Sequence, residues 1–575
     1  MKNAIFLYAL PLAGLVVLNT LLGMYRLLPE ASWSLAFLPT PELILVLLPV
    51  LIGVGVGRGS RRVFPFVGAV VGTVFSAYSL GEGAIQFLYS RAWEPLADYP
   101  LIRGAVLLIS PGDGMIVDII MAAVLVATAL VLFMAFFGVL ALVSSALSYE
   151  RERKPTHARD GIAAATSTLV VAAIAGTIAT SPAQALSVRL VGALQGDDFT
   201  IAATALDARQ EPENTSERAE PQAEDTEPQR ETEQAPDYGA PGFRDRDIYK
   251  FIVESYGITI FENEEIEEVV VPKIREMETR LNDAGYHSVS NFIRSPILGG
   301  QSWLAEATFL TGNEIDRQGR YEKLMEQGSR SIIKELEEKA DYYSLAVKPG
   351  SINGHWESEA EALGFNEVMT AYDEDFGYEG PWFSFVPIPD QFAIWKTHQR
   401  LAELRDEDGA AVDRPLYLHY QLVSSHTPFN RIPEFFEDWS RLGDGSLYHS
   451  SDTEYFDNDY LSGEEYIAGY NAGVTYVLEV ITDYLEHHIP EDDDSLFIIV
   501  GDHQPGPQVR GDSDNRAVPI HILSRDETLL EAWKQEYDYV GGMIPKQRES
   551  YASMADMFSK IMDISSRPPA DKQAE

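Results

Sequence analysis

Five stretches in the first 185 residues are almost wholly apolar. Each is long enough, or nearly so, to cross a bilayer as a helix, which takes about 20 residues. They cover positions of about 4–24, 41–56, 63–88, 115–147 and 161–180. The fourth stretch is longer than one crossing needs, so it could tilt or begin with a re-entrant turn. We therefore expect an all-α transmembrane domain of five helices over residues 1–185.

Basic residues between these stretches predict the orientation. The loop after the second stretch carries Arg58, Arg61 and Arg62, and the loop after the fourth contains Arg151-Glu152-Arg153-Lys154. With five spans both loops lie on the same side, together with Lys2, and basic loops favour the cytoplasm. Everything after the fifth span is then outside. Four spans with one buried hairpin would leave that part in the cytoplasm, which the charge pattern disfavours.

The chain changes character after the last apolar stretch. Residues of about 182–206 are moderately apolar and could form an amphipathic helix on the bilayer surface. Residues of about 207–247 are rich in Glu, Gln, Pro, Thr and Asp. Such a composition cannot bury enough apolar surface to offset the entropy of ordering, so it predicts a flexible acidic tether. We assign residues 186–246 to this juxtamembrane and linker segment, and 247–575 to an extracytoplasmic catalytic domain.

The pattern beyond the linker alternates short apolar runs with helix-like segments. We predict strands over Ile248–Glu254, Ser344–Lys348, Pro415–Ser424 and Ser495–Gly501, and helices over Glu265–Ala284, Arg320–Lys339, Ile467–Glu486 and Tyr551–Met562. Strands separated by helices favour an α/β domain with a mostly parallel central sheet covered on both faces. Functional sites of such sheets lie at the carboxyl ends of the strands.

Several predicted strands end in residues that can perform chemistry. Glu254, Lys348 and His426 each follow one apolar run, and the pair Asp502-His503 follows another. If these strands are parallel neighbours, the side chains meet at one edge of the sheet. Two carboxylates and an imidazole suit Mn²⁺, Mg²⁺ or Zn²⁺.

Ser302 is the candidate nucleophile. It follows Gly299-Gly300-Gln301, and the next residues read as the start of a helix. A serine at a helix N-terminus can bind a metal, which lowers the pKa of its hydroxyl, while the helix amides hold an anionic phosphate. Taken alone, Ser302 is more often an ordinary N-cap and an Asp-His pair more often a surface loop. The prediction rests on the order and context of these residues together.

Charge and cysteine content exclude several classes of function. The formal net charge is −43, and most of it belongs to the second part of the chain. Nucleic-acid binding needs basic patches, so this balance argues against such a partner. The acidity could reflect a salty habitat or simple solubility. There are no cysteines, which excludes disulfides, thiolate-bound zinc and a thiol nucleophile.

Four short motifs resemble one known family. They are Val253-Glu254-Ser255-Tyr256, Gly300-Gln301-Ser302 with Glu306 four residues after the serine, Ser425-His426-Thr427-Pro428-Phe429, and Gly501-Asp502-His503. In order and spacing the chain resembles the lipoteichoic-acid-synthase-like phosphoglycerol and phosphoethanolamine transferases of the alkaline phosphatase/sulfatase superfamily. The resemblance covers the membrane part, the linker and the whole soluble domain, and implies a sulfatase-like catalytic fold.

The resemblance assigns roles to individual residues. It implies that Glu254, Asp502 and His503 bind one divalent metal, for which we favour Mn²⁺ over Mg²⁺ or Zn²⁺. Ser302 matches the nucleophile and would be the fourth ligand, and His426 matches a histidine that contacts the substrate phosphate. Further candidates for substrate contacts, where the match is loose, are Lys348, His355, Trp356 and Asp390.

Two departures from the family pattern bear on the activity. The nucleophile is serine instead of the usual threonine, which retains a hydroxyl. Residues 302–306 read Ser-Trp-Leu-Ala-Glu, so the motif that matures to formylglycine is missing, which argues against sulfate-ester hydrolysis. The absence of cysteine also fits poorly with the disulfide-bearing lipid A phosphoethanolamine transferases.

The resemblance implies an enzyme of the bacterial inner membrane with its catalytic domain on the periplasmic or extracellular side. It would transfer phosphoglycerol or phosphoethanolamine from a phospholipid donor to an envelope glycan or polymer. A phosphodiesterase or sulfatase-like hydrolase of the same superfamily is the alternative. A membrane-tethered scaffold without activity is a third reading, which the intact set of Glu254, Ser302, Asp502 and His503 disfavours.

Overall fold

The computed structural model describes two compact units of the chain. They comprise Met1–Thr226 and Glu227–Glu575. Within them the described residues are 10–23, 40–56, 63–89, 93, 114–153, 246–352, 356–372, 374–383, 385–406, 411, 413–456 and 464–566. The predicted span at 161–180 and almost all of the segment assigned to the linker lie outside these residues.

The first unit consists of packed apolar helices. Their bounds are α2 (Leu10–Leu22), α4 (Pro41–Val56), α5 (Val63–Tyr89) and α7 (Gly114–Arg153). These four helices coincide with the first four predicted spans. Two of them, over Val63–Gly83 and Ala122–Tyr149, are long and apolar enough to cross a membrane, whereas the apolar parts of α2 and α4 are shorter. Five crossings and their orientation therefore stay a prediction.

The helices of the first unit pack through a shared apolar core. Leu18, Val46, Phe136 and Leu140 are among its buried side chains. Gly72 allows α5 to approach α7 closely, because a Cβ at this position would lie 2.4 Å from the ring of Phe136. The opposite sides of the same helices expose many large apolar residues, as expected of surfaces that face lipid.

An eight-stranded sheet forms the centre of the second unit. Its strands are β1 (Ile248–Val253), β2 (His287–Arg294), β3 (Tyr343–Lys348), β4 (Glu367–Thr370), β5 (Leu416–Leu422), β8 (Leu496–Gly501), β9 (Ala517–Ser524) and β10 (Val540–Gly541). Their order is β10-β2-β9-β8-β1-β5-β3-β4. The pairs β8–β1, β1–β5, β5–β3 and β3–β4 are parallel, while β9 is antiparallel to both of its neighbours. The prediction of a mostly parallel sheet is confirmed.

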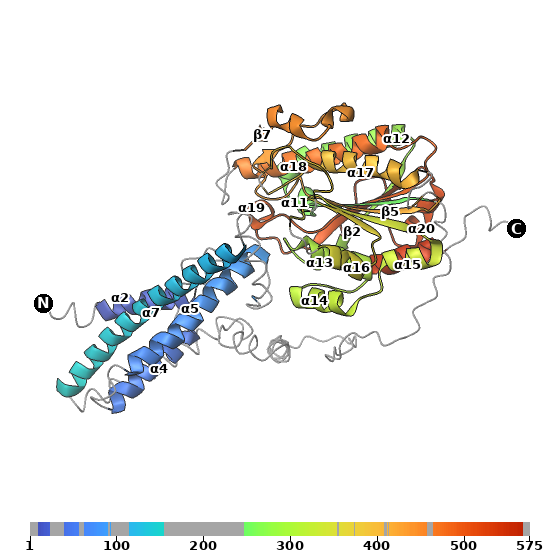
Figure 1. The fold of residues 1–575 in the computed structure, drawn as a ribbon. Helices are drawn as coiled ribbons and strands as arrows, with labels where there is room; N and C mark the ends of the chain where they lie inside the picture. The colour runs from blue at the N-terminus through green and yellow to red at the C-terminus, as the bar shows by residue number, and fades with distance from the viewer. Residues whose placement is uncertain are drawn as a thin grey trace, which may run out of the picture. The chain divides into compact units, whose positions relative to one another are not determined.

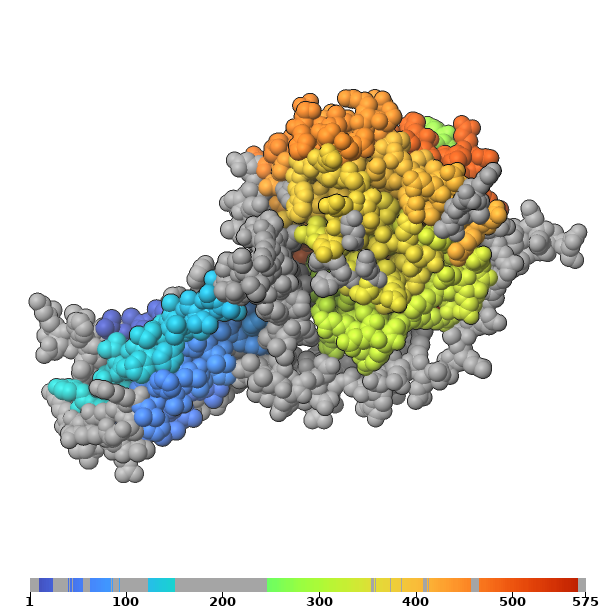
Figure 2. All heavy atoms as spheres, viewed as in Figure 1, coloured from blue at the N-terminus to red at the C-terminus, as the bar shows by residue number. Residues whose placement is uncertain are grey.

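Helices cover both faces of this sheet (Figure 1). One layer contains α12 (Glu264–Asp283), α17 (Asp390–Arg405) and α18 (Glu464–His487). The other contains α13 (Ser302–Thr311), α14 (Gln318–Gln327), α15 (Ile332–Ala340), α16 (Trp356–Leu363), α20 (Thr528–Glu536) and α21 (Asp556–Ser565). In the space-filling view, yellow-green residues of the α14–α15 region form the lower part of this unit and orange residues of the β6–α18 region the upper part (Figure 2). Shorter elements are α11 (Thr259–Glu262), α19 (Pro507–Arg510), β6 (Arg431–Ile432), β7 (Glu454–Tyr455) and two 3₁₀ turns, Trp439–Leu442 and Ser446–Ser450.

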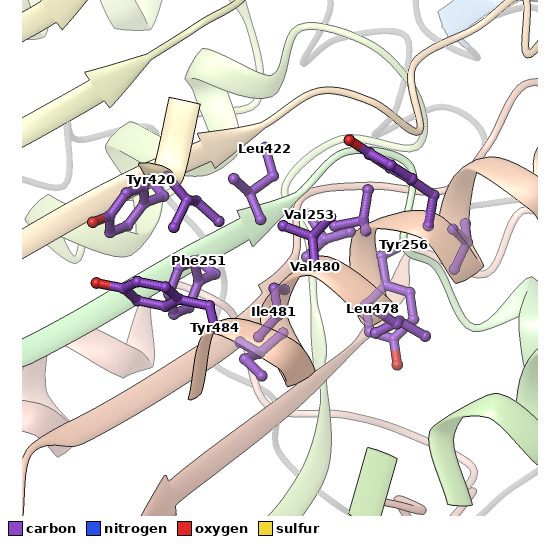
Figure 3. Close-up of a cluster of buried hydrophobic side chains, with 14 of the residues drawn as sticks. Phe251, Val253, Tyr256, Tyr420, Leu422, Leu478, Val480, Ile481 and Tyr484 are labelled. Carbon is purple, nitrogen blue, oxygen red and sulfur yellow. The ribbon is translucent and has the colours of Figure 1, made fainter. Parts of the chain in front are cut away.

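Two buried clusters hold the layers to the sheet, one on each face. On the α18 side, Phe251 of β1 stacks on Tyr420 of β5 with ring centroids 4.9 Å apart. Figure 3 shows these rings beside Tyr484 and other apolar side chains of α18. All six side chains of β1 are buried, as expected of a central strand covered on both faces. The packing of β1 on both faces fixes the position of Glu254, which directly follows this strand.

Two predicted helices differ from those in the structure. The helix predicted over 320–339 is two helices, α14 and α15, because Gly328 adopts a positive φ of 68° and ends the first one. The helix predicted over 551–562 begins only at Asp556, since Ser553 bonds to the Asp556 carboxylate in a turn before it. The strands β2, β4, β9 and β10 were not predicted. In β2 polar residues such as Ser290 and Asn291 are buried, which hides the apolar pattern of a strand.

Candidate metal centre and nucleophile

Adjacent parallel strands place Glu254 beside Asp502 and His503. Glu254 follows the last residue of β1, and Asp502-His503 follow the last residue of β8. The two strands are paired in register, with Val253 opposite Gly501. All three side chains are buried, and each offers an atom within 4.8 Å of the others. The predicted meeting of strand ends therefore occurs at this edge of the sheet.

Ser302 enters the same group from the other direction. It is the first residue of α13, after Gly300 and Gln301, whose φ angles of 63° and 61° turn the chain sharply. Its Oγ donates a hydrogen bond to Glu254 Oε2 at 2.8 Å and lies 3.3 Å from His503 Nε2. The hydroxyl thus lies at a helix N-terminus, where free backbone amides and the helix dipole favour an anion.

The donor set fits a divalent cation. Within the described part of the chain, Asp502 Oδ2 is buried without a hydrogen-bond partner. Asp502 Oδ1, in contrast, accepts the backbone amides of Ser255 at 2.8 Å and His503 at 2.6 Å. A buried carboxylate oxygen without a partner is costly, and a bound cation would remove that cost. Two carboxylates, one imidazole and one hydroxyl are a suitable set for Mn²⁺, Mg²⁺ or Zn²⁺.

The pKa values of Asp502, His503 and Glu254 also indicate that this buried group favours a positive charge. Burial and the adjacent Glu254 carboxylate raise the pKa of Asp502 to about 8. Burial alone would lower the pKa of His503, but the two carboxylates outweigh it and raise that pKa to about 9. Burial likewise opposes ionisation of Glu254, and the charge of His503 outweighs it and holds the pKa of Glu254 well below its usual range. A divalent cation would supply this positive charge directly.

Three of the six described non-glycine residues with a positive φ lie near the same residues. Ser255, Gln301 and Phe429 have φ angles of 60°, 61° and 60°, in the left-handed region that favours glycine. Each lies within three residues of Glu254, Ser302 or His426. Such residues persist where surrounding contacts enforce them, and they occur preferentially at functional sites. At Ser255 the enforcing contact is the hydrogen bond that its backbone amide donates to Asp502 Oδ1.

His426 faces the carboxylate group from the end of β5. The strand β5 is the other parallel neighbour of β1, and Ser425 Oγ donates to the backbone carbonyl of Glu254 at 2.6 Å. A positive charge on His426 is one of the influences that lower the pKa of Glu254. The half-buried His426 ring lies edge-on to Phe385, with centroids 6.3 Å apart. A contact between His426 and a bound ligand therefore stays a prediction.

Asp390, a candidate for a substrate contact, is buried and bonds to the backbone of the loop after β5. It begins α17, and its two carboxylate oxygens accept the backbone amides of Val423 at 2.8 Å and Ser424 at 2.9 Å. The hydroxyl of Ser424 in turn accepts the amide of Asp390 at 3.0 Å. Burial raises the pKa of Asp390 to about 7. The carboxylate thus holds the loop that leads to His426.

We predict that Asp390→Asn destabilises the domain by about 1–3 kcal/mol, because one backbone amide then faces the Asn NH₂ group and loses its acceptor. Urea unfolding of the purified protein measures this change. Ser446, which lies in an exposed turn, provides a control: Ser446→Ala should change stability by less than about 0.5 kcal/mol. If Asp390→Asn is as stable as the wild type, the two hydrogen bonds from backbone amides to the Asp390 carboxylate do not hold the loop.

Lys348 and Trp356 lie together beside Glu306, which is one turn after Ser302 on α13. Lys348 forms a buried ion pair with Glu306, and its Nζ lies 3.7 Å from the centroid of the Trp356 ring. It also donates to Gln421 Oε1 at 3.2 Å. Among the described residues, the hydrogen bonds and ion pairs of the Lys348 side chain are made with Glu306 and Gln421, and none is made with the metal-binding group. His355 lies outside those residues.

Three residues that support the site were not predicted from the sequence. Ser255 donates its amide to Asp502, Ser295 Oγ donates to the carbonyl of Asp502 at 2.6 Å, and Gln504 Oε1 accepts Thr259 Oγ1 at 2.7 Å. Ser255 and Gln504 directly follow predicted ligands, and Ser255 also belongs to one of the four motifs; neither signal indicates these contacts. Ser295 has none, because β2 was not predicted.

Comparison with known proteins gives structural matches only. No protein-family model and no curated protein sequence matches the chain. The lipoteichoic acid synthase LtaP from Listeria monocytogenes matches with 15% identity and a TM-score of 0.36, over 58% of this chain and 75% of that one. The C-terminal periplasmic domain of EcEptC from Escherichia coli, in complex with Zn, matches with 12% identity and a TM-score of 0.35, over 57% and 83%.

A third match extends over both units. The integral membrane protein lipooligosaccharide phosphoethanolamine transferase A from Neisseria meningitidis has 13% identity and a TM-score of 0.44, and the match covers 97% of this chain and 95% of that one. Solved structures of a lipoteichoic acid synthase and of a phosphoethanolamine transferase are thus among those that this chain resembles.

Proposed function

We propose that the chain is a membrane-anchored, metal-dependent transferase. It moves phosphoglycerol or phosphoethanolamine from a phospholipid to a hydroxyl of an envelope glycan or polymer, through a covalent phospho-Ser302 intermediate. The observation that carries this proposal is the Ser302 hydroxyl, which lies at the N-terminus of α13 and 2.8 Å from Glu254 Oε2, within the buried group that also contains Asp502 and His503.

Glu254, Asp502, His503 and the Ser302 hydroxyl would hold one divalent cation. When bound, this cation would lower the pKa of the hydroxyl and neutralise charge that develops on the phosphoryl group. We favour Mn²⁺, with Mg²⁺ and Zn²⁺ as alternatives; the EcEptC domain has been solved with Zn. Asp502 Oδ2, which is buried without a hydrogen-bond partner and lies 3.4 Å from His503 Nε2, supports the presence of a cation but does not distinguish among the three metals.

The chain's own residues account for both halves of the reaction. In the first, Ser302 Oγ attacks the phosphorus, the bond from phosphorus to the diacylglycerol oxygen breaks, and diacylglycerol leaves with the proton that the serine gives up. In the second, the acceptor hydroxyl attacks the phosphoserine, and Ser302 regains a proton. The N-terminal amides of α13 bind the phosphate oxygens in each half, and His426 faces them from β5.

The apolar helices would anchor the enzyme in the membrane that contains the phospholipid donor. We propose five crossings of the bacterial inner membrane, with the 247–575 domain on the periplasmic or extracellular side and residues 186–246 as the tether. The donor phospholipid and the envelope acceptor are then both within reach. The net charge of −43 continues to argue against a nucleic-acid partner.

Product analysis tests the proposal. The full-length protein in detergent micelles is incubated with Mn²⁺ and with headgroup-labelled phosphatidylglycerol or phosphatidylethanolamine, with and without glycans extracted from a bacterial envelope. We expect diacylglycerol release together with label on the glycan. Label that appears only as free glycerol phosphate or phosphoethanolamine, even with glycan present, would identify a hydrolase and contradict transfer.

A further inference from the structure

A buried charged cluster lies behind the nucleophile. Its members are Glu306 of α13, Lys348 of β3 and His419 of β5, and their side chains are at most 1% exposed. Glu306 lies four residues after Ser302 on the same helix, so both project from one face of α13, one turn apart. The chemistry proposed above uses neither Glu306 nor His419.

The contacts of Glu306 connect α13 to two strands of the sheet. One carboxylate oxygen pairs with Lys348, and the other lies 2.6 Å from His419 Nε2. Lys348 is itself fixed by Gln421 Oε1 at 3.2 Å and by the ring of Trp356. Burial opposes the charge on Glu306, but Lys348 and His419 outweigh it and lower the pKa of Glu306 to about 2. The carboxylate is therefore ionised and held through one oxygen by the hydrogen-bonded ion pair with Lys348, while the other oxygen lies against the His419 ring.

The remaining contacts of α13 are less directional. Apart from Glu306, the helix buries mainly apolar and small side chains, among them Leu304, Ala305 and Leu310, and apolar burial has no preferred direction. Apolar burial alone specifies the position of the helix less sharply than a contact with fixed geometry does. An ion pair with fixed geometry resists a shift of the helix along the sheet.

We propose that Glu306 is a positioning residue for Ser302: its contacts with Lys348 and His419 fix α13 against the sheet and so keep the hydroxyl on Glu254. This inference rests on the proposed function, since it takes Ser302 as the nucleophile. Lys348 then acts through Glu306, and its ammonium group is directed at α13. A nucleophile displaced by about 1 Å can lose about 100-fold in rate.

Glu306→Gln tests this role, because it keeps the shape of the side chain and removes its charge. We expect kcat for diacylglycerol release from micellar phosphatidylglycerol and phosphatidylethanolamine, counted per folded and Mn²⁺-loaded molecule, to fall about 100-fold. KM should stay within about twofold, because uniform binding of the lipid is not affected. Glu335→Gln is the matched control. Glu335 is also buried and paired with two cations, Arg330 and Lys339, but on α15; this variant should lose stability and keep its kcat.

The double variant Glu306→Gln/Lys348→Met separates positioning from simple stabilisation. It removes the Lys348 ammonium group that Glu306→Gln leaves without its carboxylate partner, so its stability should recover in part relative to Glu306→Gln. The directional contact is still missing, and kcat should stay low. Recovery of both stability and kcat would overturn the inference, as would a wild-type kcat in Glu306→Gln.

Ser302→Ala distinguishes failure of the inference from failure of the proposed function. If Ser302→Ala is inactive while Glu306→Gln keeps the wild-type kcat, only the positioning role is wrong. If Ser302→Ala keeps the wild-type rate, the nucleophile itself is wrong and both proposals fall together.

Discussion

Ser302→Ala is expected to reduce headgroup transfer by roughly 10⁴-fold or more, because the variant has no atom that can form the covalent intermediate. The Ser302 hydroxyl is the one that bonds to Glu254 Oε2 at the start of α13. Alanine leaves the helix and its neighbours in place, so binding of the donor should change little. The rate of diacylglycerol release from labelled phospholipid in micelles measures the effect.

Two control variants make this result specific. Ser302→Thr retains a hydroxyl at the same position, as in the family that the motifs resemble, and should keep measurable transfer. Ser255→Ala removes a hydroxyl that donates to the other oxygen of Glu254 at 3.2 Å. Ser255 does not begin a helix. The hydrogen bond from its backbone amide to Asp502 remains possible in the alanine variant. A loss in Ser255→Ala as large as that in Ser302→Ala would indicate general damage to the site.

Asp502→Asn is expected to remove metal binding while the fold is retained. The asparagine oxygen can keep both backbone hydrogen bonds of Asp502 Oδ1, and the NH₂ group replaces Oδ2, which has no hydrogen-bond partner and lies 3.4 Å from His503 Nε2. A cation at 100 times its dissociation constant stabilises the wild type by about 2.7 kcal/mol. We expect thermal unfolding of the variant to lose this Mn²⁺-dependent increase, and transfer to fall by about 10³-fold or more, since the metal supplies several kcal/mol of transition-state stabilisation.

Asp390→Asn is the matched control for this change. Asp390 is also a fully buried aspartate beside the site, but both of its oxygens are already taken by backbone amides. Its variant should be less stable than the wild type and still gain stability from Mn²⁺. Wild type treated with a chelator should behave as Asp502→Asn does. An unchanged Mn²⁺ response in Asp502→Asn would place the metal elsewhere or exclude it.

Strand-end reasoning found the metal-binding group because parallel pairing leaves few alternatives. Once β1 and β8 are neighbours in register, Glu254 and Asp502 follow them at the same edge. The sequence also showed the turn before Ser302, since two glycines precede a helix-like segment. For these residues local pattern and tertiary position agree, and hence they could be predicted without the structure.

The same reasoning could not place Lys348. Its strand β3 ends at the expected edge, but an alternating side chain can point to either face. Which face it takes depends on α13 and on Glu306, which lies 42 residues earlier in the chain. A strand-end lysine directed into the cluster behind α13 has the same local sequence as one directed into the site.

Asp390 shows a second limit of local patterns. Its carboxylate caps the backbone at Val423 and Ser424, more than 30 residues later. Only the packing of α17 beside β5 makes that contact, and no spacing in the sequence marks it. The strand β9 was missed because its apolar run contains Pro519, and a proline usually argues against a central strand.

Mass spectrometry of Ser302 tests the central claim most directly. The full-length protein with Mn²⁺ is incubated briefly with headgroup-labelled phosphatidylglycerol or phosphatidylethanolamine and then digested. We predict that the peptide containing Ser302 carries phosphoglycerol or phosphoethanolamine on that serine, and that the adduct disappears when an acceptor glycan is added. Release of diacylglycerol while Ser302 stays unmodified, or an adduct on a different residue, would contradict the account.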